Sequence, residues 1–321
     1  MNVLVTGGAG YIGSVLTRAL LTRGHRVRVL DSLLYGGESL LGVWSHPAFE
    51  FSRGDIRNPG DTRRGLKKMD AVVHLAAIVG DPACARRPEL AQATNQEASL
   101  ALLHESKNSG CGRFIFASTC SNYGKMKDPD RFVDETSELS PLSLYARTKV
   151  AVERAVMDQP DGELCATCLR FATVFGVSPR MRFDLTVNEF VLEMVHKKRL
   201  TVFGEQFWRP YVHVSDVARA IAAVLEAPAE QVAGEVFNVG STRQNYQKKQ
   251  LVELIRPHAP DAAVEFVHKQ EDPRDYRVSF AKMEKALGCA VSRTVEDGIA
   301  ETVSLVKNNI INDHENPRYK N

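Results

Sequence analysis

The 321-residue sequence predicts an α/β fold: a doubly wound, mostly parallel sheet with helices on both faces, followed by a smaller C-terminal α/β lobe. Two observations carry this prediction. Short apolar runs alternate with helical patterns through the first half, and a cluster of glycines directly follows the first run. With 44% hydrophobic and 25% charged residues, the chain has the composition of a soluble globular protein.

The elements follow in order along the chain. Apolar runs predict strands at residues 2–6, 26–30, 49–52, 71–74, 113–117 and 165–171. Helical spacing predicts helices at 13–22, 88–109 and 145–157. Beyond Gly176 the character changes, with an arginine-bearing polar loop at 178–184, helices at 186–196 and 215–225, and a strand-like segment at 209–214. We therefore expect a first domain over residues 1–172 and a lobe over 173–321, some segments of which return to the first domain.

Charge and composition exclude several classes of partner. The net charge is +2, which offers no electrostatic case for nucleic acid or a membrane surface. No signal-type leader and no run of about 18 apolar residues is present, so a cytoplasmic protein is expected. The six cysteines show no disulfide framework, and Cys165 and Cys168, three apart in an expected strand, face opposite sides. No metal site is expected.

The glycine cluster predicts a dinucleotide site. Gly7, Gly10 and Gly13 lie between the first expected strand and a helix, where glycines permit a tight turn and bring the backbone close to a pyrophosphate. Their spacing is a variant of the G-x-G-x-x-G fingerprint of Rossmann-type folds. A bound dinucleotide is the interpretation that this context favours.

The residue at the end of the second strand favours NAD over NADP. Asp31 can accept hydrogen bonds from the adenosine ribose hydroxyls, and its charge would repel a 2′-phosphate. Arg26 and Arg28 are nearby but lie inside the strand. Asp55 and Ile56, after the third strand, are candidates for the adenine edge.

Tyr145 and Lys149 are four residues apart at an expected helix start, so their side chains share one face. A tyrosine that acts as a general base needs a phenol pKa well below its reference of about 10. An ammonium one turn away supplies a positive charge that lowers that pKa. The pair therefore predicts proton transfer to and from a substrate hydroxyl, although such a pair also arises often by chance.

Together these residues resemble the extended short-chain dehydrogenase/reductase family, in particular its nucleotide-sugar epimerases. The resemblance rests on residues 6–13, 31, 55–56, 74–77, 95, 118–119, 123–124, 145, 149, 169–171, 178–180 and 209–216. It implies that Thr119 completes a catalytic triad with Tyr145 and Lys149. It also implies cofactor contacts from Tyr11, Ile12, Leu75, Ala76, Ala77, Asn95, Ser118, Tyr145, Lys149 and Ala172.

The residues after Thr119 narrow the reaction that the resemblance implies. Family dehydratases carry Asp-Glu there, and decarboxylating members carry Glu at the second position, whereas this chain has Cys120 and Ser121. Epimerisation by transient oxidation at a sugar hydroxyl, most simply at C4, remains as the first expectation. A 4-keto-sugar reductase, a synthase like UDP-apiose/UDP-xylose synthase in which Cys120 contacts the substrate, and a non-catalytic NAD sensor are the alternatives.

The second half is expected to bind a nucleotide-diphosphate sugar. Arginines suit bidentate recognition of phosphate, and the resemblance points to Arg209 first and Arg274 second. Further candidate substrate contacts are Thr173, Arg180, Arg182 and Asn188. The loop at 78–84 is a candidate sugar contact, and a homodimer through the helices at 88–109 and 145–157 is expected by analogy with the family.

Overall fold

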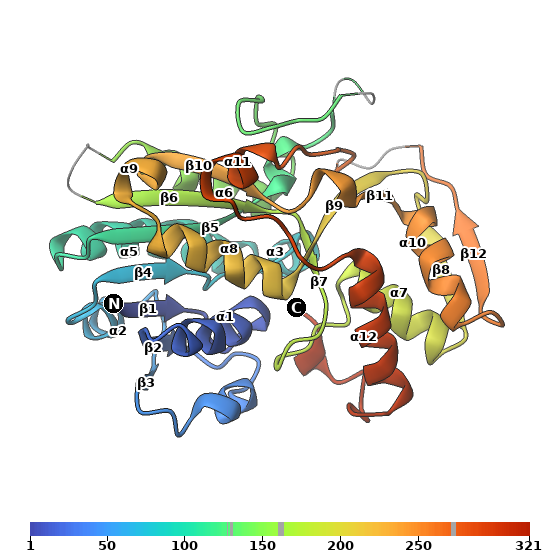
Figure 1. Ribbon diagram of the computed structural model, residues 1–321, viewed down its shortest axis with the longest axis horizontal. Coiled ribbons are helices and arrows are strands. Elements are labelled where there is room, and N and C mark those ends of the chain that lie inside the picture. Colours follow the sequence, from blue (N-terminus) through green and yellow to red (C-terminus); the bar gives the residue numbers. More distant parts are fainter. Residues whose placement is uncertain (127, 129–130, 160–163, 271–273) are drawn as a thin grey trace.

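The computed structural model describes residues 1–126, 128, 131–159, 164–270 and 274–321 (Figure 1). Within these residues, seven parallel strands form the central sheet and confirm the predicted fold class. Their order is β10 (Glu235–Val239), β6 (Cys165–Phe171), β5 (Arg113–Thr119), β4 (Ala71–His74), β1 (Asn2–Thr6), β2 (Arg26–Asp31) and β3 (Phe49–Arg53). The sequence missed β10, which pairs with β6 and brings the second half of the chain back to the first sheet.

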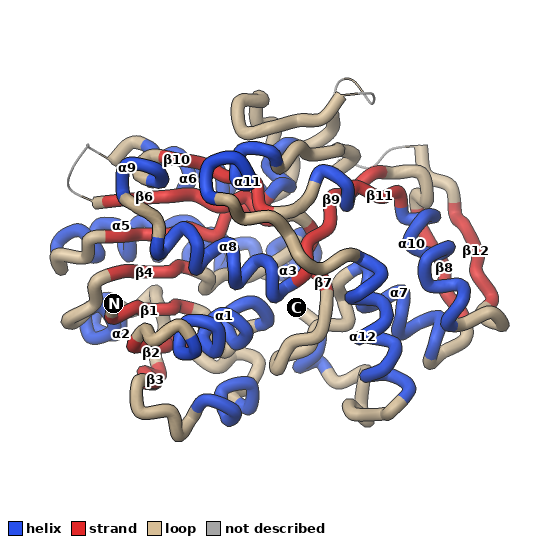
Figure 2. Tube along the Cα trace, in the orientation of Figure 1, coloured by secondary structure: helices blue, strands red, loops and turns tan. Residues whose placement is uncertain are grey.

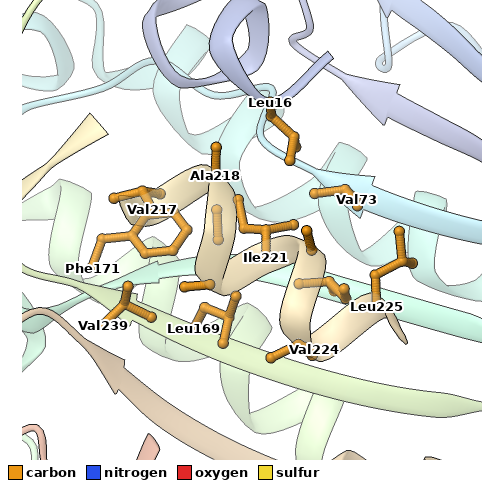
Figure 3. Close-up of a cluster of buried hydrophobic side chains, with 14 of the residues drawn as sticks. Leu16, Val73, Leu169, Phe171, Val217, Ala218, Ile221, Val224, Leu225 and Val239 are labelled. Carbon is orange, nitrogen blue, oxygen red and sulfur yellow. The ribbon is translucent and has the colours of Figure 1, made fainter. Parts of the chain in front are cut away.

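Helices cover both faces of this sheet, which is why its central strands are continuous apolar runs. One face carries α1 (Tyr11–Thr22) and α8 (Val214–Glu226). The other carries α2 (Pro59–Leu66), α5 (Ala98–Asn108) and α6 (Leu144–Met157). Figure 3 shows how Val217, Ile221 and Leu225 of α8 pack between α1 and the sheet.

The long helix expected at 88–109 is interrupted. It consists of α4 (Pro88–Gln92), a π-helical turn at Ala93–Glu97, and α5. The side chain of Asn95 in this turn receives a hydrogen bond from the Ile78 backbone N–H at 2.7 Å and donates one to its carbonyl at 2.9 Å. The turn thereby ties the helix to the loop after β4, a kind of distortion common at functional sites.

The second lobe lies beside the carboxyl ends of the central strands (Figure 2). Its three-stranded sheet has the order β11 (Asn245–Gln247), β9 (Trp208–His213) and β7 (Thr173–Phe175), and β8 (Arg199–Phe203) pairs with β12 (Ala263–Val267). A separate apolar core joins these strands to α7 (Thr186–Val195), α10 (Lys248–Ile255) and α12 (Val295–Lys307). Among the described residues, no helix combines the length and apolar character that crossing a bilayer would need.

Candidate active site

Thr119 ends β5, and Tyr145 and Lys149 lie in the first two turns of α6, which packs against β5. Ser143 begins α6 by accepting a hydrogen bond from the Ala146 N–H at 3.1 Å, which places Tyr145 in the first turn. Lys149 Nζ donates to the Ala117 carbonyl of β5 at 2.8 Å and lies 5.9 Å from the centre of the Tyr145 ring. Thr119 is the last residue of β5, and its hydroxyl accepts from the Ser121 N–H at 3.1 Å.

The phenol pKa differs from the sequence expectation. Burial raises the pKa of Tyr145 above its usual range, and the neighbouring Cys84 and Asp81 act in the same direction. Burial also lowers the pKa of Lys149 to about 8, because its side chain is only 3% exposed. In this structure, therefore, desolvation decides the direction of the phenol pKa, and the prediction of a lowered phenol pKa was wrong.

The buried ammonium of Lys149 predicts a pH-dependent stability. Between its folded pKa of about 8 and its usual value of 10.5, the unfolded chain binds more protons. The cost of burying this charge is therefore fully present below pH 8 and disappears as the pH rises towards 10.5. We expect Lys149→Met to exceed the wild type in unfolding free energy at pH 7, by up to about 3 kcal/mol, and the gap to narrow by pH 10.

Denaturant unfolding of both apoproteins from pH 7 to pH 10 measures this effect. The difference between the two isolates Lys149, because all other titrating groups occur in both proteins. If the difference in unfolding free energy between the two proteins did not change with pH, the pKa of Lys149 would not be lowered in the folded protein.

The glycine cluster forms a tight cradle between β1 and α1. Gly7 has a φ of +72°, and a Cβ at Gly13 would lie 2.2 Å from the Gly7 carbonyl oxygen, so side chains are excluded at both positions. Helix α1 begins at Tyr11, two residues earlier than expected. Ala76, after β4, backs the turn, since a Cβ at Gly7 would meet its N–H at 2.7 Å. This cradle fits a dinucleotide pyrophosphate at the start of α1.

Asp31 ends β2 beside this cradle. Its carboxylate accepts from the Ala9 N–H at 3.0 Å and from the Leu33 N–H at 2.8 Å, which links the glycine turn to the loop after β2. Burial raises the pKa of Asp31. Because a carboxylate has about four acceptor positions, two remain for ribose hydroxyls, as NAD requires.

Several expected cofactor residues have other partners. The carboxylate of Asp55 is paired with Arg57 at 2.6 Å, and its backbone N–H donates to the Asp61 carboxylate at 2.9 Å. Asn95 holds Ile78 with its amide and so positions the loop after β4. The hydroxyl of Ser118 donates to Glu153 at 2.6 Å and faces away from Thr119.

Cys120 is not a substrate contact, which corrects the expectation from its place after Thr119. Cys120 begins a 3₁₀ turn after β5 (Cys120–Tyr123), and its side chain lies in the core on the α1 and α8 side of the sheet, where it is 1% exposed. Its thiol lies 3.3 Å from the Arg170 carbonyl oxygen, and burial raises its pKa further. A thiol so placed cannot reach a bound sugar, which removes the basis for a synthase in which this cysteine acts.

A buried ion pair of Glu153 and Arg170 packs against the end of β5, the strand that carries Thr119. Arg170 Nη2 lies 2.5 Å from Glu153 Oε1, and both side chains are nearly fully buried. Arg170 also donates to the Tyr123 hydroxyl at 2.9 Å, and Tyr123 donates to Asn238 of β10 at 2.8 Å. The Tyr-Gly segment of the sequence is thus part of a structural network that anchors the end of β5.

The arginines that were expected to bind the substrate lie in different surroundings. Arg209 is buried in β9, with its guanidinium 5.5 Å from the centre of the Tyr276 ring. Arg274 lies 3.3 Å from Asp81, which connects the second lobe to the loop at 78–84. Arg180 lies on the cofactor side of the site, over the ring of Tyr35 at 4.1 Å.

Asn188 and Thr173 differ in their suitability as substrate contacts. Asn188 is fully buried and receives from the Gly176 N–H at 3.0 Å while donating to the Arg182 carbonyl at 3.0 Å. It therefore braces the loop after β7, and the expectation of a substrate contact is corrected. Thr173 is half-buried at the start of β7 and keeps that expectation.

Sequence reasoning missed two groups beside the triad. Tyr276 is 2% exposed, and its hydroxyl lies 3.4 Å from that of Ser121. Asp81 lies in α3 (Asp81–Arg86), close enough to raise the pKa of Tyr145. Both lie in segments that the sequence marked for other reasons: the loop at 78–84 and the segment around Arg274. No spacing in the sequence identifies a single carboxylate or a single phenol as part of a site. Among the described residues, no cluster of three or more His, Cys, Asp or Glu side chains is arranged to hold a metal.

Comparison with known proteins places this site in a family. Residues 3–240 match the NAD dependent epimerase/dehydratase family. The chain is 29% identical to a UDP-glucose 4-epimerase of Corynebacterium glutamicum, with 95% of this chain and 97% of the relative covered. It is 30% identical to a dTDP-glucose 4,6-dehydratase of Streptomyces griseus, with 94% and 93% covered. The structure of a Bacillus cereus UDP-glucuronic acid 4-epimerase in complex with UDP-glucuronic acid and NAD is similar, with a TM-score of 0.86, 26% identity, and 96% and 99% covered.

Proposed function

The chain belongs to the NAD-dependent epimerase/dehydratase family, and we propose that it is a nucleotide-sugar epimerase that oxidises one sugar hydroxyl, at C4, and returns the hydride to the other face. That it is an NAD-dependent enzyme follows from the family itself. The relatives include epimerases, dehydratases and decarboxylases, so the choice among these reactions must come from the residues of the site.

The triad supplies the proton transfers of this reaction. Tyr145 takes the proton from the sugar hydroxyl and later gives it back. Lys149 lies on the same face of α6, and its positive charge would favour the phenolate form that Tyr145 must have before it takes the proton. The Thr119 hydroxyl, at the end of β5, donates a hydrogen bond to the reacting sugar oxygen. Bound NAD supplies the hydride acceptor and donor.

One observation carries the choice of epimerisation. Where the dehydratases and decarboxylases of the resemblance have a carboxylate, this chain has Ser121, whose hydroxyl lies beside that of Tyr276. Cys120 points into the core. The carboxylate of Asp81 is close to Tyr145 but is paired with Arg274. Elimination of water or loss of carbon dioxide needs more acid–base groups than this arrangement offers, whereas hydride and proton transfer alone do not.

Incubation with a panel of UDP-, dTDP-, GDP- and CDP-sugars, without added cofactor, tests the proposal. The expected result is one sugar converted to an equilibrium mixture with its C4 epimer, with no net change in NADH absorbance. Formation of a 4-keto-6-deoxy sugar or release of carbon dioxide would contradict it. Conversion that requires stoichiometric NADH or NADPH would identify the 4-keto-sugar reductase instead.

The homodimer and the cytoplasmic location stay predictions. Among the described residues, the large exposed apolar side chains lie outside α4, α5 and α6, the helices expected at the dimer interface. These exposed side chains are Met1, Leu34, Leu41, Trp44, Phe132, Leu142, Phe203, Phe266 and Ile310.

A further inference from the structure

Residues 314–321, which follow α12 and are called the strap below, end between α1 and α12 (Figure 1). On the second lobe, the strap packs against the loop after β7 and the end of α7. His314 is 4% exposed, and its ring lies 5.3 Å from that of Phe183 and 4.7 Å from that of His196. The Phe183 N–H also donates to the Tyr319 carbonyl at 2.9 Å. The strap is therefore anchored to the second lobe.

A turn within the strap brings Arg318 to the first domain. The turn spans Pro317–Tyr319, and the Asn316 side chain caps it by accepting from the Arg318 N–H at 3.1 Å. The guanidinium of Arg318 is paired with the carboxylate of Glu38. It also lies beside Gly36, where a Cβ would be 3.4 Å from Arg318 Nη2. The strap thus reaches the segment of the first domain that follows β2.

The contact with Glu38 is linked to the glycine cradle. Glu38 begins a 3₁₀ turn (Glu38–Val43), in which the Ser39 hydroxyl donates to the Ala9 carbonyl at 2.8 Å. The Ala9 N–H in turn donates to the Asp31 carboxylate at 3.0 Å. The strap, the segment after β2 and the glycine cradle are therefore connected on the side where the adenosine ribose is expected.

The end of the strap contacts a different part of the first domain. The Asn321 carbonyl oxygen accepts from Arg86 Nη2 at 2.7 Å, and Arg86 ends α3, the helix that follows β4. The Asn321 N–H donates to the Asp184 carboxylate at 3.1 Å, and its side-chain oxygen accepts from Arg180 Nη2 at 2.8 Å. Asn321 thus joins the loop after β7 to α3, which packs beside Tyr145.

The two contacts with the first domain lie on either side of β1. In the central sheet β1 is placed between β4 and β2. Adjacent strands are about 4.8 Å apart, so the ends of β4 and β2 are separated by about 10 Å. Three residues, the step from Arg318 to Asn321, reach about 10 Å when extended. The strap therefore crosses the carboxyl end of β1, where the glycine cradle begins.

We propose that the strap closes over bound NAD and controls its exchange. A dinucleotide that has its pyrophosphate at the cradle after β1 and a ribose at Asp31 after β2 extends along the same edge of the sheet that the strap crosses. NAD then leaves only after the contacts of Arg318 and Asn321 with the first domain have opened. The inference rests on the NAD dependence of the family and is independent of the choice of epimerisation. Slow exchange of NAD would suit an enzyme that returns its hydride in every cycle.

Release of labelled NAD from two variants tests the proposal. Each protein is loaded with radiolabelled NAD and mixed with an excess of unlabelled NAD, with no sugar present. Deletion of residues 318–321 is expected to raise the rate of NAD dissociation about 10- to 100-fold, because the contacts that cross the edge of the sheet are lost. Arg318→Glu, which keeps the length of the strap, is expected to raise the rate about 3- to 5-fold.

A charge exchange separates the strap contact from damage to folding. Glu38→Arg combined with Arg318→Glu restores an ion pair and is expected to return the dissociation rate to nearly the wild-type value. The matched control is Lys307→Glu, the same reversal of charge in the last turn of α12, which should leave the rate unchanged.

An unchanged dissociation rate after the deletion would overturn the proposal. Tighter NAD binding without faster release would also overturn it, because the strap would then occupy the place of the cofactor instead of covering it. If the charge exchange released NAD as fast as Arg318→Glu alone, the pair of Arg318 and Glu38 would not hold the strap closed. Because these measurements use no sugar and no turnover, a failed epimerase assay would not change their meaning.

Discussion

Replacing Tyr145 with phenylalanine is expected to lower kcat by about 10³-fold and to leave NAD binding and folding intact. The substitution removes only the hydroxyl that exchanges a proton with the sugar. The ring would still pack against Ile78, Ala83 and Cys84, which surround it now.

The comparison variant for this test is Tyr246→Phe, which removes a phenol from β11 in the second lobe. Turnover with the sugar found in the substrate panel, and NAD content measured by absorbance after acid release, give the two values required. Full turnover by Tyr145→Phe would show that Tyr145 does not exchange the proton with the sugar. Equal losses in both variants would point to damaged folding rather than lost chemistry.

Removing the carboxylate of Glu153 is expected to have the largest effect on stability. Its two oxygens receive hydrogen bonds from Arg170 Nε at 3.1 and 3.3 Å and from Nη2 at 2.5 Å, in a place where the side chains are 4% and 5% exposed. Glu153→Ala would leave the Arg170 charge buried and unpaired, at a cost of about 3–5 kcal/mol. The hydroxyl of Ser118 would lose its acceptor too, so the end of β5 that carries Thr119 should loosen.

Chemical denaturation of the apoprotein measures this cost. Glu153→Gln keeps most of the hydrogen-bonding shape and should cost less than Glu153→Ala. Glu50→Ala removes an exposed carboxylate from its 2.8 Å pair with Arg28 and should cost less than about 1 kcal/mol. If Glu153→Ala were as mild as Glu50→Ala, the network behind β5 would not be what holds Thr119 in place.

The parts of the fold that the sequence predicts best are those with strong local patterns. Four strands are buried on both faces and appear in the sequence as apolar runs: β1, β4, β5 and β6. The glycine turn predicts the helix that follows it. Strand β10 was missed because Glu235–Val239 carries a charged and an amide residue in five positions. Its place in the sheet depends on pairing with β6, which is a long-range contact.

In the candidate site, too, local patterns predict some residues, whereas long-range packing decides the position of others. The triad and Asp31 follow from spacing and from their places at strand and helix ends. The side of the sheet on which Cys120 lies depends on where β5 ends, and the direction of the pKa of Tyr145 depends on burial by the loop at 78–84. The place of Arg180 depends on the docking of the loop after β7, through Gly176 and Ser178, onto Tyr11. No local pattern contains such contacts, because they form only when the two halves of the chain meet.

The central claim is that a hydride leaves a sugar carbon and returns to that same carbon. It can be followed with the identified substrate carrying deuterium at C4 in ordinary water, and with unlabelled substrate in deuterium oxide, with the product epimer analysed by NMR and mass spectrometry. The account predicts that the deuterium stays at C4 with its configuration inverted and that no solvent hydrogen enters the ring. Loss of the label, or uptake of solvent hydrogen at C5, would contradict it.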